Sequence, residues 1–281
     1  MKVIKKILQM QKVADEARCA GRKVGFVPTM GYLHKGHLSL IRQARQLSEL
    51  VVVSIFVNPT QFGPHEDYQN YPRDLSRDAK LLRQVGCDIL FLPSVEEMYP
   101  QGYCSYVDVE NLTQLLCGAS RPSHFRGVAT VVTKLFNIVK PHLAVFGQKD
   151  AQQAFVIRRM VTDLNQDLEI VVAPTIREPD GLAMSSRNEY LTPQERADAL
   201  VLYQALKWAH EQIVEGQRNI EYLVQGMTKM IQNKKTAQID YISFVDTEKL
   251  HSLKRLEGEV LIALAVKFGR ARLIDNLLIK V

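Results

Sequence analysis

The chain has 281 residues, 46% of them apolar and 23% charged, which is the composition of a globular protein with one large domain or two modest ones. No run approaches the roughly 18 uncharged apolar residues of a membrane span, and the basic segment 1–23 lacks the apolar core of a signal peptide. The net charge of +6 comes from dispersed lysines and arginines, which suits a polyphosphate ligand and gives little support for nucleic-acid binding.

The cysteines form no C-x-x-C pair, and a chain of this length does not need disulfides for stability. We therefore expect reduced thiols, a cytoplasmic location and no membrane partner. The residues concerned are Cys19, Cys87, Cys104 and Cys117.

Continuous apolar, β-branched runs recur between residues 23 and 174, as expected for strands that are buried on both faces. They lie at 23–27, 50–57, 87–93, 142–147 and 168–174. Helix-like stretches separate several of these runs, at 38–47, 76–85, 128–139 and 151–164. This alternation predicts an α/β fold with a Rossmann-like, doubly wound and mostly parallel sheet.

Each predicted strand is followed at its carboxyl end by a polar, turn-rich segment. In open α/β sheets, ligands bind outside the carboxyl ends of the strands, so we expect these five segments to line one crevice. The segments begin at residues 28, 58, 93, 147 and 174.

The sequence changes in character beyond residue 176. Residues 191–216 read as one long helix, with Thr192 as N-cap, Pro193 at the first helical position and Glu195 completing a capping box. A second helix and three strand-like runs follow, at 220–231, 238–246, 260–269 and 271–281.

Helices followed by adjacent strands predict a smaller C-terminal α+β domain. We place this domain at 177–281 and the sheet-bearing domain at 1–176, with a Pro/Asp/Gly-rich hinge at the boundary.

Two histidines, His34 and His37, lie at the junction of the first predicted strand and its helix, where they can bind a metal, bind phosphate or cap the helix. A zinc site needs further protein ligands, and no H-E-x-x-H motif or cysteine is nearby. Capping alone leaves Gly31 and Gly36 unexplained. A glycine turn that feeds a helix N-terminus binds anions, so the pattern favours phosphate recognition.

Two further segments carry charged or hydroxyl groups at predicted strand ends. Ser185, Ser186 and Arg187 can clamp a phosphate, or they can form an ordinary polar loop. Lys149 beside Asp150 can place an ammonium on a phosphate and a carboxylate on a ribose, or it can form a surface ion pair.

Neutral amides and a basic cluster complete the candidates. Asn58, Gln61 and Gln153 suit hydroxyls and carboxylates of a small ligand. Arg121, His124 and Arg126 form either a second anion-attracting cluster or a solvated basic turn.

The segment "PTMGYLHKGH" resembles the HxGH signature of the nucleotidyltransferase superfamily, and "MSSR" resembles its second, KMSKS-type signature. The whole set of segments resembles the pantothenate synthetase (pantoate–β-alanine ligase) family more narrowly. The matching pieces, in the order of the family, are "PTMGYLHKGHLSLI", "FVNPTQFGPHEDYQNYPR", "RPSHFRGVATVVTKLFNIVKP", "VFGQKDAQQ", "PTIREPDGLAMSSRNEYL" and "ARLIDN".

This resemblance implies a ligase that joins pantoate to β-alanine with ATP and Mg²⁺ through a pantoyl adenylate. It also implies a homodimer and a C-terminal domain that shifts over the ATP site. Catalysis would fall to His37, His34, Lys149, Ser185, Ser186 and Arg187. ATP would contact Met30, Gly31, Tyr32, Leu33, His34, Lys35, Gly36, His37, Gly147, Gln148, Lys149, Asp150, Ile176, Met184, Ser185, Ser186 and Arg187.

Pantoate would be held by Gln61 and Gln153, and we add Asn58, Arg121 and His124 as substrate contacts. The chain departs from the family at two positions that bear on nucleotide affinity. Gln148 replaces an expected glutamate, and Lys35 stands where an acidic residue is common.

The Mg²⁺ ligands are not evident, because the candidate Asp78 at a helix start can equally serve the helix dipole. Two other functions are alternatives. One is a superfamily transferase that leaves a nucleotidyl group on its product, and the paired amides Gln61 and Gln153, which suit a small hydroxy acid, discriminate against it. The other is a basic nucleic-acid binder, which requires clustered lysines and arginines and exposed aromatic residues that the sequence lacks, so we expect no nucleic-acid partner.

Overall fold

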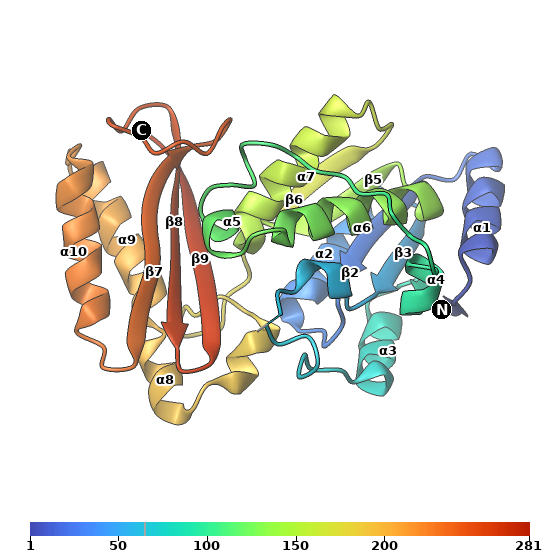
Figure 1. The fold of residues 1–281 in the computed structure, drawn as a ribbon, viewed down its shortest axis with the longest axis horizontal. Helices are drawn as coiled ribbons and strands as arrows, with labels where there is room; N and C mark the ends of the chain where they lie inside the picture. The colour runs from blue at the N-terminus through green and yellow to red at the C-terminus, as the bar shows by residue number, and fades with distance from the viewer. Residues whose placement is uncertain (65) are drawn as a thin grey trace.

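The larger part of the molecule is a six-stranded parallel sheet with the order β1-β4-β3-β2-β5-β6. Figure 1 labels its strands β2, β3, β5 and β6. The computed structural model describes residues 1–64 and 66–281. The strands are β1 (Lys2–Ile4), β2 (Val24–Thr29), β3 (Leu50–Ile55), β4 (Ile89–Phe91), β5 (Leu143–Gly147) and β6 (Glu169–Ala173). The predicted Rossmann-like sheet is confirmed, and the short edge strand β1 is an addition to it.

Helices cover both faces of this sheet. One face packs against α1 (Ile7–Cys19), α6 (His124–Val139) and α7 (Ala151–Asp163), and the other packs against α2 (Lys35–Leu47) and α3 (Leu75–Gln84). Successive strand residues therefore enter different cores: Phe26 faces the first set of helices and Val27 the second. Burial on both faces explains why the strands read as continuous apolar runs.

The strand order reverses between β2 and β5, which is where a doubly wound sheet leaves a crevice. Strand β4 is separated from β2 by β3, and the segment after it forms α4 (Val95–Met98) beside the start of α1. The expectation of one crevice lined by five segments is therefore correct for four of them and wrong for the segment that begins at residue 93.

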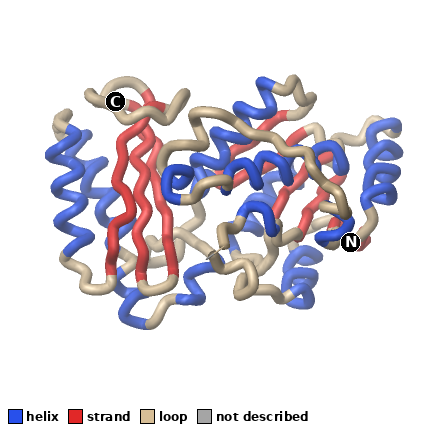
Figure 2. Tube along the Cα trace, viewed as in Figure 1, coloured by secondary structure: helices blue, strands red, loops and turns tan. Residues whose placement is uncertain are grey.

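The C-terminal domain is a three-stranded antiparallel sheet with helices on one face (Figure 2). Its elements are α8 (Pro193–Asp198), α9 (Val201–Val214), α10 (Ile220–Gln232), β7 (Ala237–Asp246), β8 (Glu259–Phe268) and β9 (Ala271–Lys280). The expected α+β character is thus confirmed. Short helical turns complete the chain at η1 (Pro59–Gln61), α5 (Cys117–Ser120), η2 (Gln148–Asp150) and η3 (Ser186–Tyr190).

The prediction of a single helix over 191–216 is wrong, because a tight turn separates α8 from α9. The main-chain N–H of Leu202 donates to the carbonyl oxygen of Ala199, three residues back, at 3.2 Å. The predicted start is correct: Thr192 and Glu195 form reciprocal capping hydrogen bonds of 2.9 and 3.3 Å.

The two domains share a hydrophobic cluster. Val245, Leu261 and Ala263 of the C-terminal sheet belong to the same buried cluster as the side chains of α6 and α7. The opposite face of the C-terminal sheet packs against α9 and α10. Among the described residues, no helix has the length and apolarity that crossing a membrane requires.

Candidate active site

The turn between β2 and α2 has an unusual backbone that a distant carboxylate holds. Gly31 and Tyr32 both have positive φ, of 85° and 50°. The main-chain N–H groups of Tyr32 and Leu33 donate to the two carboxylate oxygens of Asp78, at 2.7 and 2.8 Å. Asp78 is buried at 1% exposure, and burial raises the pKa of its carboxyl while the two N–H donors oppose the rise.

The two imidazoles lie against each other at the start of α2, with ring centroids 4.0 Å apart. The N–H of His34 donates to Nδ1 of His37 at 3.3 Å, so His37 contributes to capping as well as facing the cavity. Nδ1 of His34 is buried with no hydrogen-bond partner in the described part of the chain. A Cβ on Gly36 would lie 2.9 Å from the His34 ring, which explains the glycine between the histidines.

Burial and neighbouring cations keep both imidazoles neutral near pH 7. The pKa of His34 falls from 6.5 to about 4, first because of burial and then because of Lys149. The pKa of His37 lies well below 6.5, because of burial, His34 and Lys149. Since Nδ1 of His37 accepts a hydrogen bond, the ring proton resides on Nε2, which leaves an N–H donor for a ligand.

Two connected hollows lie at the carboxyl ends of the strands. The inner cavity, of about 230 Å³, brings together the histidine turn, Gln61, the segment 147–150, Ile176 and the segment 184–187. The outer cleft, of about 590 Å³, lies between the two domains. Both hollows are lined by Lys149 and Arg187, so they form one continuous site.

The segment after β5 is fixed by the C-terminal domain. Nδ2 of Asn276 on β9 donates to the carbonyl oxygens of Gln148 and Lys149, at 2.9 Å each. Nε2 of Gln148 donates to Oδ1 of Asn276 at 3.0 Å. The ammonium of Lys149 lies 3.4 Å from Oδ1 of Asp150, so the ion pair foreseen as one alternative is present at the rim of the cavity.

The segment 184–187 closes the site on the other side. The N–H of Met184 donates to the carbonyl oxygen of Ile176 at 3.0 Å, which places these two predicted nucleotide contacts side by side. The hydroxyl of Ser186 is buried and lies 3.1 Å from the hydroxyl of Tyr71, while Oγ of Ser185 accepts from the N–H of Arg187.

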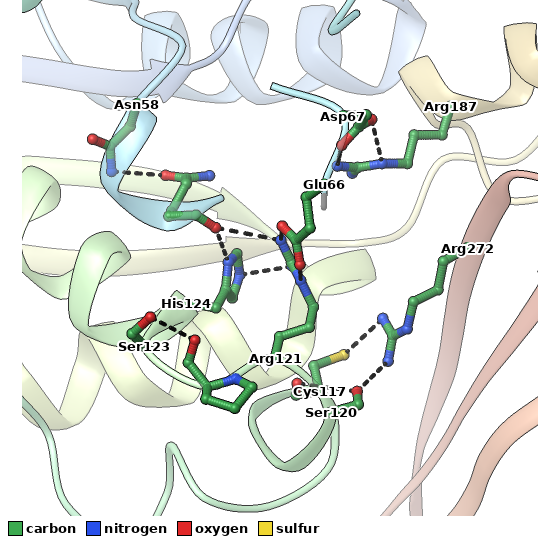
Figure 3. A network of polar contacts seen from close by, with 12 residues as sticks. Asn58, Glu66, Asp67, Cys117, Ser120, Arg121, Ser123, His124, Arg187 and Arg272 are labelled. Carbon is green, nitrogen blue, oxygen red and sulfur yellow. Dashed lines mark hydrogen bonds and ion pairs between the residues drawn. The ribbon is translucent and has the colours of Figure 1, made fainter. Parts of the chain in front are cut away.

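Arg187 is paired with an acidic residue that the sequence reasoning did not single out. Its Nε and terminal nitrogen donate to the carboxylate of Asp67 at 3.2 and 3.0 Å (Figure 3). Asp67 lies within "FGPHEDYQNYPR", a stretch whose match to the family was the available signal. The guanidinium of Arg187 therefore binds a carboxylate at the place where we expected it to bind a phosphate.

The three candidate amides are Asn58, Gln61 and Gln153, and Asn58 differs from the other two in its hydrogen bonds. Asn58 is 1% exposed, and its amide is committed to protein partners: Nδ2 donates to Oε1 of Gln61 and to the carbonyl of Gly127, both at 3.1 Å. Its Oδ1 accepts from the hydroxyl of Tyr99 at 2.8 Å. Asn58 thus orients Gln61, and all three amides lie in the lining of the inner cavity.

Arg121 and His124 form a second network at the rim (Figure 3). Arg121 donates to both carboxylate oxygens of Glu66, at 2.6 and 2.5 Å, and lies 3.1 Å from Nε2 of His124. Nδ1 of His124 lies 2.8 Å from the carbonyl oxygen of Gln61. Burial, followed by Arg121, lowers the pKa of His124 from 6.5 to about 4. Like Asp67, Glu66 was not singled out from the sequence. Its ion pair with Arg121 neutralises part of the positive charge of the predicted anion-attracting cluster.

The remaining candidates are peripheral. Lys35 is exposed in the first turn of α2, and Arg126 lies over the ring of Tyr106, 4.2 Å from its centroid. Within residues 1–64 and 66–281, no three or more His, Cys, Asp or Glu side chains are arranged as a metal site. The notable feature of the earlier metal candidate Asp78 is that both of its oxygens accept main-chain hydrogen bonds from the histidine turn.

The fold and this lining define an α/β enzyme whose cavity, at the switch point of a parallel sheet, is lined by histidine, lysine and arginine side chains. The family model described as pantoate-beta-alanine ligase matches residues 2–278. The chain therefore belongs to the pantoate–β-alanine ligase family, and it is a ligase.

Curated relatives agree over the full length. The chain is 59% identical to the pantothenate synthetase of Pelotomaculum thermopropionicum over 98% of both chains, and 54% identical to that of Acetivibrio thermocellus over 100% of both. A crystal structure of pantothenate synthetase from Thermus thermophilus matches with a TM-score of 0.94 and 48% identity over 99% of both chains.

A second solved structure contains ligands. The pantoate–β-alanine ligase of Francisella tularensis, complexed with beta-gamma ATP and β-alanine, matches with a TM-score of 0.81 and 36% identity. The match covers 99% of this chain and 97% of the Francisella tularensis chain.

Proposed function

We propose that this protein condenses pantoate with β-alanine to give pantothenate, using ATP and forming a pantoyl adenylate. The observation that carries the proposal is the convergence of neutral His34 and His37, Lys149 and Arg187 on a cavity that also holds Gln61. The ligands in the Francisella tularensis structure support ATP and β-alanine as substrates.

In the first step, a carboxylate oxygen of pantoate attacks the α-phosphorus of ATP, and the bond to the bridging oxygen of the β-phosphate breaks, releasing pyrophosphate. In the second step, the amine of β-alanine attacks the acyl carbon, loses a proton and displaces AMP. Little acid–base catalysis is needed in the first step, which depends on alignment and on stabilising phosphate charge. His37 Nε2–H is the donor that the geometry leaves free for this charge.

The phosphates and the nucleoside would occupy different parts of the site. We assign the phosphates to the segment 30–37, to Lys149 and to Ser185, Ser186 and Arg187. The nucleoside would contact the segment 147–150, with Asp150 near the ribose and Ile176 against the adenine. The hydrogen bond between Met184 and Ile176 supports this arrangement, because it joins the two sides of the proposed nucleotide site.

Pantoate would bind in the inner cavity between Gln61 and Gln153. Val131 and Leu135 of α6 line the same cavity and would contact the dimethyl carbon of the acid. Asn58 would act through Gln61. We keep Arg121 and His124 as contacts at the rim, where they neighbour both hollows.

Mg²⁺ would arrive as part of the substrate MgATP, since this ion commonly keeps its waters and phosphate oxygens and takes only one or two carboxylates. The carboxylates of Asp67 and Asp150 line the outer cleft, but we assign neither to Mg²⁺, because Asp67 is paired with Arg187 and Asp150 is assigned to the ribose. We further propose a homodimer, a cytoplasmic location, and a boundary at Ile176/Arg177 beyond which the C-terminal domain covers the nucleotide. All four cysteines are free, which is consistent with a reducing compartment.

ATP–pyrophosphate exchange that depends on pantoate tests the first step, and AMP release that depends on β-alanine tests the second. Absence of pantoate-dependent exchange would refute the proposal. Exchange without β-alanine-dependent AMP release would favour the nucleotidyltransferase alternative. His37→Ala should abolish most of the exchange while the protein keeps its fold, and His210→Ala, on the exposed side of α9, serves as the matched control.

A further inference from the structure

A buried carboxylate outside the proposed chemistry holds the backbone that carries both histidines. We propose that Asp78 is a positioning residue, which fixes the 31–34 turn so that His34 and His37 face the phosphates. This inference rests on the proposed function.

The turn needs an external anchor because of its backbone conformation. Gly31, at φ 85°, adopts a left-handed conformation freely, but Tyr32, at φ 50°, carries a side chain and does so at a cost. A strained residue of this kind persists only where surrounding contacts determine it. The guanidinium of Arg77, 5.0 Å from the ring centroid of Tyr32, is one such contact.

Asp78 supplies the stronger contact. Its two oxygens accept from the consecutive N–H groups of Tyr32 and Leu33, at 2.7 and 2.8 Å, although Asp78 lies 45 residues further along the chain from Leu33. Consecutive N–H groups in a turn of this kind form a concave anion site, and here the anion is a side chain of α3. Both oxygens are needed as acceptors. An asparagine would present its NH₂ group to one of the two N–H donors.

The anchor lies directly beside the imidazoles. Leu33 precedes His34, whose own N–H donates to Nδ1 of His37. Leu33 is fully buried, so the chain cannot shift there without disturbing the core. A displacement of the turn therefore moves the N-cap of α2 and both rings together.

The experiment compares Asp78→Asn with Asp74→Ala in pantoate-dependent exchange. Asp74 caps the same helix by accepting from the N–H of Arg77 at 2.9 Å, and within the described part of the chain its side chain makes no hydrogen bond to residues 31–34. We expect Asp78→Asn to lower kcat on the order of 100-fold, the effect of a misplacement of about 1 Å, with little change in KM for pantoate. Asp74→Ala should lower the unfolding temperature without lowering kcat.

Two further readouts separate positioning from loss of fold. The imidazole ¹⁵N chemical shifts of His34 and His37 should move in Asp78→Asn and stay in place in Asp74→Ala. Adding Tyr32→Gly to Asp78→Asn should recover part of the exchange, because glycine adopts the left-handed conformation without an anchor. If Asp78→Asn does not fold, Asp78→Glu, which keeps two acceptor oxygens one methylene further out, undergoes the same measurements.

A folded Asp78→Asn protein with wild-type exchange and unchanged histidine shifts would overturn the inference. Its failure is distinguishable from failure of the proposed function. A wild-type protein without pantoate-dependent exchange would refute the function, whereas the histidine shifts and the calorimetric binding of inorganic pyrophosphate would still test Asp78.

Discussion

The side chain of Gln148 donates a hydrogen bond of 3.0 Å to Asn276, across the boundary between the two domains. In return, the side-chain amide of Asn276 donates hydrogen bonds to the carbonyl oxygens of Gln148 and Lys149. The C-terminal domain therefore helps to determine where the main chain that carries Lys149 lies.

Gln148→Glu should weaken this contact, although glutamate is the residue that the family resemblance led us to expect. The carboxylate cannot donate to Oδ1 of Asn276, which is then left facing another acceptor. We expect a loss of about 1–2 kcal/mol in the free energy of unfolding, measured with urea, and a higher KM for ATP. Gln204→Glu on the exposed face of α9 is the control, and equal effects of the two substitutions would contradict the prediction.

Asp67→Asn should strengthen ATP binding. The carboxylate of Asp67 accepts hydrogen bonds from the guanidinium of Arg187, so a phosphate that binds Arg187 must displace it. The pair is partly exposed, so its removal is worth up to about 1 kcal/mol, or about a fivefold lower Kd for ATP.

Calorimetric titration with ATP measures this change, and Asp108→Asn at an exposed loop position is the control. A weaker affinity in Asp67→Asn would show that Asp67 assists the nucleotide instead of competing with it, for instance through Mg²⁺.

Arg177→Met should destabilise the protein strongly. Arg177 donates to both oxygens of Asp275, at 2.6 and 2.9 Å, and Asp275 is 2% exposed. Burial raises the pKa of Asp275 and Arg177 opposes the rise, so removal of the arginine leaves an uncompensated buried carboxyl. We expect a loss of about 3 kcal/mol in urea denaturation at pH 7.

The matched control for this pair is Arg159→Met, which breaks an exposed i,i+4 pair with Asp163 and should change the free energy of unfolding by no more than about 0.5 kcal/mol. Asp275→Asn added to Arg177→Met should restore part of the loss. A double variant as unstable as the single one would assign the effect to lost packing over the ring of Tyr203.

Stability should fall as the pH drops below 6.5. The pKa values of His34 and His124 are about 4 in the folded protein against 6.5 for a free histidine, so the unfolded chain binds more protons between these values. Stability is therefore complete above the unfolded pKa and declines as the pH falls towards the folded pKa, by up to about 1.4 kcal/mol per histidine and pH unit.

Urea denaturation across this pH range measures the slope. His124→Gln should make it shallower, whereas His210→Gln, at an exposed position, should leave it unchanged. A flat profile in the wild-type protein would contradict the burial that lowers the two pKa values.

The sheet and most helices could be predicted because periodicity and turn chemistry are local. The start of α8 could be predicted from the capping residues Thr192 and Glu195. No residue pattern near Ala199 indicates the turn that ends this helix. The edge strand β1 was missed for a related reason: three residues become a strand only by pairing with β4, far along the chain.

The candidate site was foreseen through its cations, amides and histidines, and the roles of these residues stay predictions. The acidic partners were not foreseen. Glu66 and Asp67 lie more than 50 residues from the arginines they bind, and pairings of that separation leave no spacing signal in a single sequence. Asp78 was read as a helix-start residue or metal ligand, because its bonds to the histidine turn depend on the fold.

The hydrophobic cluster shared by the domains limits how far the C-terminal domain can move. Rotation of the C-terminal domain away from the larger domain would expose Val245, Leu261 and Ala263 to solvent, together with the facing side chains of α6 and α7. Every 40 Å² or so of apolar surface exposed in this way costs about 1 kcal/mol. The shift of the C-terminal domain over the ATP site that the family resemblance implies should therefore be small, and heating should unfold both domains in a single cooperative transition.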